Sequence, residues 1–176
     1  MKSTRAELKT TGLLLRRFIW ISAFAFWMGG FSFYGGVVVT IGAKVLAGGE
    51  HEFGFITRQV TVWLNIAGAI ALVVFLLDWA MDREVLPPFG RWTLFAVWLA
   101  MAVMHGGLVA VHRRMDGLLD PDSQSIRQLT RFHQLHSSYL MISGLQWAAS
   151  LILLIGTLYT WMRADRRESN RDFPRS

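Results

Sequence analysis

Four long apolar stretches, separated by short charged segments, constrain this chain more than any other feature. They comprise residues 18–43, 60–77, 92–111 and about 135–162. A helix that crosses the hydrocarbon core of a bilayer needs about 20 mostly apolar residues, and each stretch is roughly that long. Strands of a membrane barrel would instead alternate polar and apolar residues over about 10 positions. We therefore predict an all-α fold: a polytopic membrane protein with four transmembrane helices in an antiparallel bundle.

The charged segments divide the chain into three parts. Residues 1–17 mix leucine with Lys and Arg, which predicts a cytoplasmic basic lead-in that forms an interfacial helix. Residues 18–162 hold the four-helix transmembrane domain, and residues 163–176 form an Arg-rich cytoplasmic tail for which we expect no fixed structure. The longest connection contains Asp-Pro-Asp-Ser at 120–123, which indicates a helix stop and a new N-cap, so a short surface helix is expected there.

The distribution of Lys and Arg predicts the orientation. Of the 18 such residues, 12 fall in the two terminal tails and the second connection, which lie on one side of the membrane. Because Lys and Arg accumulate on the cytoplasmic side, we expect both termini in the cytoplasm and the bundle in an inner or plasma membrane. The net charge of +6 is then explained by tails beside anionic lipids, so the expected partner is the lipid bilayer and not a nucleic acid.

All five histidines are expected on the opposite, outer side of the bundle. Two of them share a face of the third helix with Met101, because they recur at steps of three and four. Two more begin the fourth helix, and the helical hairpin brings both pairs to similar depths. The candidate ligands are His105, His112, His133 and His136, with His51 and Met101 as additional ligands.

Three interpretations of this histidine cluster stay open. Imidazole binds copper, zinc and haem iron, so the cluster can be a metal or haem site. Polar groups inside a membrane also pair with one another, and His105 is then expected to bond Gln146 or Ser143 in a polar network. Proton or quinone chemistry is the third interpretation. Asp78, which closes the second helix, is interpreted as a solvated interfacial residue.

Small residues line one face of the first helix. Gly29, Ser32, Gly36 and Thr40 recur at steps of three and four. Small side chains let membrane helices approach closely. The face therefore predicts close packing, either within the bundle or against a membrane-protein partner or a second copy of the chain.

Few features of the chain suggest an enzyme. The absence of cysteine excludes disulfides, iron–sulfur clusters and thiolate metal sites. No HExxH motif is present, and Ser137 and Ser138 directly follow His136, so they point away from its face of the helix. We therefore predict a protein without catalytic activity.

Two stretches resemble a known family. The first is Phe-Trp-Met-Gly-Gly-Phe-Ser-Phe-Tyr at 26–34, followed by three valines at 37–39 and Lys-Val-Leu at 44–46. The second is Arg-Phe-His-Gln-Leu-His-Ser-Ser at 131–138. Both are similar to the family of unknown function 4149, the transmembrane protein 205-like membrane proteins. The Trp-x-Gly-Gly helix is also similar to copper-resistance D-type membrane proteins.

The resemblance to family 4149 implies a four-helix membrane protein without an established activity. A proline that family members often carry at the end of the first helix is replaced here by Thr-Ile-Gly at 40–42. The positions that match the family motifs are Trp27, Gly29, Gly30, Arg131, His133 and Ser137.

Together, these patterns predict a non-enzymatic integral membrane protein with a histidine-lined polar site at its outer mouth, used in metal or small-solute handling. The alternatives are an accessory or assembly subunit of a larger membrane complex and a haem-binding electron carrier.

Overall fold

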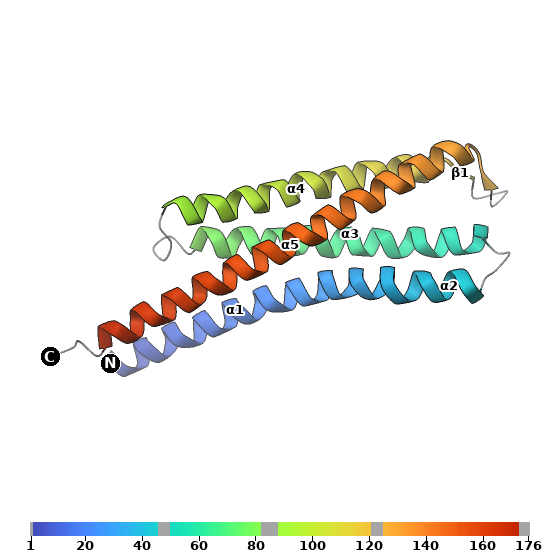
Figure 1. Ribbon diagram of the computed structural model, residues 1–176. Helices are drawn as coiled ribbons and strands as arrows, with labels where there is room; N and C mark the ends of the chain where they lie inside the picture. The colour runs from blue at the N-terminus through green and yellow to red at the C-terminus, as the bar shows by residue number, and fades with distance from the viewer. Residues whose placement is uncertain (1, 46–49, 82–87, 121–124, 173–176) are drawn as a thin grey trace.

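The computed structural model describes residues 2–45, 50–81, 88–120 and 125–172 and confirms the all-α four-helix bundle (Figure 1). Its elements are α1 (Lys2–Phe33), the π-helical turn η1 (Tyr34–Val38), α2 (Val39–Val45), α3 (Glu50–Met81), α4 (Pro88–Asp116), β1 (Leu119–Asp120), β2 (Ser125–Ile126) and α5 (Leu129–Asp172). Four helical segments are long and apolar enough to cross a bilayer: Thr10–Gly42, Ile56–Met81, Gly90–Asp116 and Leu129–Arg167. The chain is a multi-pass membrane protein.

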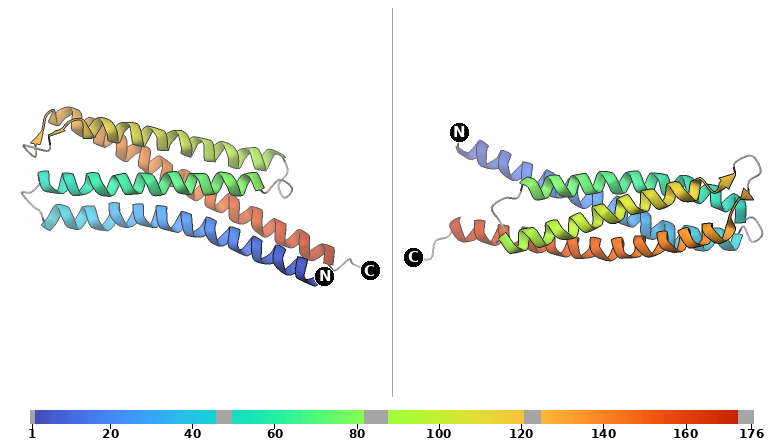
Figure 2. Two further views of the ribbon diagram at one scale, coloured as in Figure 1. Left: turned by 180° about the vertical axis from the view of Figure 1, so that it is seen from behind. Right: turned by 90° about the horizontal axis from the view of Figure 1, so that it is seen from above.

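The bundle has two distinct ends. Both chain termini lie at one, which we call the terminal end, and the β1–β2 turn lies at the other, which we call the hairpin end (Figure 1). Helix α5 crosses the bundle obliquely, beside α1 at the terminal end and beside α4 at the hairpin end (Figures 1 and 2). As a result, α2 and α5 are well separated at the hairpin end, and this separation positions the candidate site.

Residues 2–17 are helical and continue without a break into the first span, since α1 is one helix from Lys2 to Phe33. Their position at the membrane interface stays a prediction. Two other local expectations are wrong. The Arg-rich tail is helical as far as Asp172, and an ion pair of 2.7 Å from Arg17 to Asp165 joins this extension to α1. Among the described residues of the longest connection, the structure has a short antiparallel β-pair and no surface helix, with β1 opposite β2.

An aromatic core holds the helices together toward the terminal end. Trp20 on α1 packs against Phe75 on α3 and Trp161 on α5, with ring centroids 4.6 and 5.6 Å apart. Trp20 and Phe75 are 1% and 3% exposed, so these rings fill the interior where three helices meet. Most other large apolar side chains of the spans face outward, as the surface of a membrane-embedded bundle requires.

Asp78 belongs to this interior and not to the interface. It is 7% exposed, and its Oδ1 lies 3.0 Å from Nε of Arg16 on α1. The interpretation of Asp78 as a solvated residue is therefore wrong. The sequence places Arg16 in a basic run, but helix α1 turns it inward, where the Asp78 charge offsets its own.

The small-residue face of the first helix is only partly used inside the bundle. Ser32 accepts a hydrogen bond of 3.1 Å from Nε1 of Trp147 on α5. Thr40 donates to the carbonyl of Gly36 within its own helix. Gly29 and Gly36 are exposed, and a Cβ at either position would meet no atom within 4 Å. Within the bundle, Ser32 is thus the residue of this face that contacts another helix, and Gly29 and Gly36 remain exposed.

Candidate functional site

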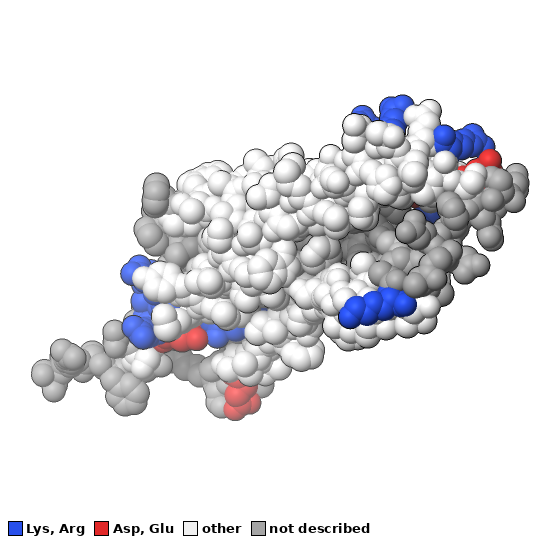
Figure 3. Space-filling model, turned by 45° about the vertical axis from the view of Figure 1, so that its right-hand side comes forward, with Lys and Arg blue, Asp and Glu red and all other residues white. Residues whose placement is uncertain are grey.

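A cavity of about 340 Å³ lies at the hairpin end, where α5 has diverged from α2. All parts of the bundle contribute to its wall, including η1 and β1. The volume lies in the range of small-molecule sites, roughly 300–1,000 Å³. Figure 3 shows the surface hollowed at this end, with Lys and Arg side chains (blue) above and below the hollow. The lining residues that carry the argument below are Tyr34, Arg58, His112, Asp116, His136 and Ser143.

An ion pair forms part of the cavity wall. Nε of Arg58 on α3 donates to Oδ1 of Asp116 at the end of α4, at 2.9 Å. The two charges offset each other, so this pair joins two helices without adding net charge to the wall. His112, one turn before Asp116, places its Nε2 3.6 Å from Oδ2 of Asp116, which is too long for a hydrogen bond.

Three buried polar atoms from three different helices line this cavity without a hydrogen-bond partner among the described residues. They are Oη of Tyr34, Nε2 of His112 and Oγ of Ser143, the last of which lies near the Tyr139 hydroxyl without meeting hydrogen-bond geometry. His112 and Ser143 are only 8% and 3% exposed. Leaving a buried polar group unpaired costs about 1–3 kcal/mol, so groups of this kind are normally satisfied by protein, water or ligand. Their convergence on one cavity identifies it as a place where a polar ligand group or water is needed.

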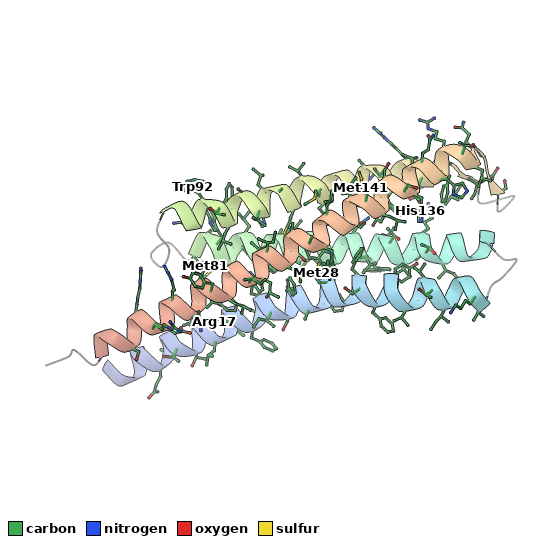
Figure 4. All side chains as sticks on the ribbon, in the orientation of Figure 1. Arg17, Met28, Met81, Trp92, His136 and Met141 are labelled. Carbon is green, nitrogen blue, oxygen red and sulfur yellow. The ribbon has the colours of Figure 1, made fainter. Side chains whose placement is uncertain are left out.

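The remaining wall is apolar and aromatic. Phe31 and Tyr34 contribute rings from the α1–η1 side, and Phe132 and Tyr139 contribute rings from α5. His136 stacks on Phe132 with the rings 4° apart in orientation and 6.3 Å between centroids. Figure 4 shows His136 extending from α5 toward α3. The site therefore combines a few polar atoms with a mainly hydrophobic surround, as ligand pockets usually do.

The π-helical turn η1 shapes the wall opposite α5. It contains the glycine pair 35–36, and both Tyr34 and Gly35 line the cavity. A π-turn adds a residue to one helical turn, which shifts the side chains that follow, and such turns are frequent at functional sites. The wall is open at Gly35, since a Cβ there would meet nothing within 4 Å.

His105 occupies a separate position deeper in the bundle and does not line the cavity. Its Nε2–H donates to the backbone carbonyl of Asn65 on α3, at 3.0 Å. Its ring stands edge-on to Trp27 on α1, with centroids 6.1 Å apart. A carbonyl can only accept, so this bond assigns the neutral ring's proton to Nε2 and leaves Nδ1, which has no partner among the described residues. His105 thus connects α1, α3 and α4.

The expected bond from His105 to Gln146 or Ser143 is absent from the described residues. Nε2 of Gln146 donates instead to the backbone carbonyl of Met101, at 3.1 Å. Oη of Tyr139 donates to the side chain of Asn65 at 3.4 Å, which links α5 to α3. His105 and Gln146 therefore bond to the backbone of neighbouring helices and not to each other.

The structure brings together only some of the predicted ligands. His112 and His136 share the cavity, His105 lies outside it, and His133 is exposed beside Phe132. Met101 is fully buried in the helix interface. The side chain of His51 lies outside the described residues. Over the described part of the chain, no three His, Asp or Glu side chains lie where they could hold one metal ion.

Sequence reasoning missed two members of the site, Tyr34 and Arg58. Tyr34 immediately precedes a glycine pair, so a signal for it was present in the sequence. The pairing of Arg58 with Asp116 carried no such signal, because the two residues are 58 positions apart.

Comparison with known proteins adds nothing to this geometry. No family model, no curated protein and no solved structure matches the chain. The resemblance to family 4149 therefore stays a prediction.

Proposed function

We propose that this protein is a non-enzymatic membrane protein that binds a small, largely apolar molecule in the hairpin-end cavity. The observation that carries the proposal is the convergence of three unpartnered buried polar atoms, of Tyr34, His112 and Ser143, on one cavity of about 340 Å³. Of the functions expected from the sequence, this corresponds to small-solute handling at a site that two of the histidines line. The proposal is also compatible with family 4149, which has no established activity and to which we propose the chain belongs.

A pair of adjacent glycines provides the test. Gly35 lines the cavity and Gly36 does not, although both are exposed positions of the same π-turn with nothing within 4 Å of an added Cβ. The variant Gly35→Leu should fill the cavity, and Gly36→Leu is its matched control. Small molecules that co-purify with each protein in mild detergent are extracted and measured by mass spectrometry. Loss from Gly35→Leu alone supports the proposal; equal retention by both variants contradicts it.

We further propose that the hairpin end faces the outer side of an inner or plasma membrane, with both termini cytoplasmic. The support is the excess of Lys and Arg in the segments at the terminal end. In this orientation the cavity lies in the outer half of the bilayer.

A metal or haem site is a weaker candidate. Its support is confined to the shared position of His112 and His136 in one cavity, with Asp116 3.6 Å from His112. An absorption spectrum and elemental analysis of the same purified sample test it directly. A haem band or a stoichiometric amount of copper or zinc would favour an electron carrier or a metal-handling protein.

An accessory role in a larger membrane complex is favoured by one observation. Gly29 and Gly36 lie exposed on one face of the first span with open space around them, as in helices that pack closely on another helix. Substitution of Gly29 by Leu would block such an approach. The complex size in native electrophoresis should fall in Gly29→Leu if the face carries a partner, and an unchanged size would argue against this role.

A further inference from the structure

Two hydroxyl groups face the cavity from opposite walls. Tyr34 belongs to η1 and Ser143 to α5, and both line the same volume with their oxygen atoms buried and unpartnered within the described chain. A hydroxyl group has one proton to donate. The pair therefore offers two uncharged donors from two different elements of the cavity wall.

The charges of the wall favour an uncharged occupant. Its two fully charged side chains, Arg58 and Asp116, lie 2.9 Å apart and offset each other. An ionised ligand group would have to leave water without a free counter-charge in the lining, which is expensive in a low-dielectric interior. A neutral acceptor such as a carbonyl oxygen needs only the hydroxyl groups that are present.

The shape of the wall favours a flat ring. Aromatic side chains line both sides, with Phe31 and Tyr34 opposite Phe132 and Tyr139. Aromatic rings pack well against a planar ring in offset or edge-on geometry. The volume of about 340 Å³ holds one substituted six-membered ring.

We propose that the occupant is a quinone with an apolar tail, held by hydrogen bonds from Tyr34 and Ser143 to its two opposite carbonyl oxygens. The inference rests on the proposed function and names the ligand class of that cavity. It concerns binding only, and no electron transfer is assigned to the site.

The test measures binding of decylubiquinone to the full-length, delipidated protein in detergent, by the amount that co-elutes in gel filtration at increasing concentration. Two other probes are compared with the quinone. A decyl-substituted arene without carbonyl groups tests whether binding needs carbonyls, and a short-chain phosphatidylcholine tests whether ester carbonyls are sufficient. We expect saturable binding of one quinone per chain, at least tenfold tighter than the arene, and no displacement by the phospholipid.

The double variant Tyr34→Phe with Ser143→Ala should bind the quinone on the order of tenfold more weakly, as expected for two lost neutral hydrogen bonds. The matched control is Tyr159→Phe with Ser138→Ala, which changes two exposed hydroxyl groups of α5 outside the cavity and should leave the affinity unchanged. The thermal midpoint of both proteins is compared, so that a folding defect is recognised.

Equal binding of arene and quinone, displacement by phosphatidylcholine, or an unaffected double variant would overturn the quinone assignment. In those cases a molecule that is lost from Gly35→Leu and kept by Gly36→Leu would still support the cavity as a binding site. Failure of both experiments would remove the proposed function itself.

Discussion

The ring of His105 on α4 lies directly over Gly68 on α3. A Cβ built at Gly68 would be 2.6 Å from Cε1 of His105 and 2.7 Å from Nε1 of Trp27, closer than real Cβ contacts. The absence of a side chain at Gly68 is thus what lets three helices meet around the imidazole. This close approach explains why a buried histidine outside the cavity still matters for the fold.

The substitution Gly68→Ala should lower the free energy of unfolding by about 1–3 kcal/mol, as expected when a methyl group is forced into a packed interior. The control is Gly106→Ala on α4, where an added Cβ meets nothing within 4 Å. Thermal unfolding of both variants in the same detergent measures the difference. Equal midpoints for the two proteins would show that the Trp27 and His105 rings can move aside.

Asp78→Asn should destabilise the bundle by about 3–5 kcal/mol, because the Arg16 guanidinium, whose side chain is 18% exposed, would lose the Asp78 charge beside it. Asp165→Asn is the matched control, since it removes the ion pair with Arg17 at a side chain that is 52% exposed. Exposed pairs contribute only about 0–1 kcal/mol. The two unfolding midpoints should therefore differ clearly, and similar losses would contradict the buried role of Asp78.

Substitutions of His105 and His136 should affect different properties of the protein. His105→Leu should reduce stability by about 1 kcal/mol, through loss of the bond to the Asn65 carbonyl, and leave the co-purified molecule in place. His136→Leu changes the cavity wall and should alter retention of that molecule with a smaller effect on stability. Mass spectrometry and thermal unfolding of both variants decide this. The reverse pattern would place the ligand near His105.

The absence of cysteine from the chain makes its orientation directly measurable. Single cysteines at Gly117 and Arg166 place one thiol at each end of the bundle, at exposed positions. In intact cells, an impermeant maleimide should label Gly117→Cys and not Arg166→Cys. Labelling of only the second would invert the orientation and put the cavity in the cytoplasmic half of the membrane.

Stoichiometric copper or zinc is not expected in the purified protein. Among the described residues, no three His, Asp or Glu side chains lie close enough together to hold one metal ion. The two imidazoles that share the cavity are fewer than the three or four protein ligands of typical zinc sites. Elemental analysis after purification without chelator, and again after incubation with each metal, measures the content. One metal ion per chain, lost on substitution of both His112 and His136, would restore the metal-site hypothesis.

The sequence by itself determined the four spans and their order. Whether a segment enters a bilayer depends on the hydropathy of about 20 consecutive residues, which is a local property. The same local reasoning erred where a segment's surroundings decide its structure. The pairing of Arg17 with Asp165 across two distant helices supports the helical C-terminal extension, and nothing near Asp165 in the sequence indicates it.

Only the tertiary structure decided which polar residues form a site. Helical spacing predicted which face of each helix carries the histidines. It did not determine the crossing angle between α4 and α5 or their offset along the helix axes. The oblique course of α5 brings Ser143 and His136 opposite Tyr34 and leaves His105 to bond the backbone of Asn65. Crossing angle and offset are set by the packing of whole helix surfaces, including close approaches such as the one over Gly68. The cavity is a product of that packing, which no single segment of the chain encodes.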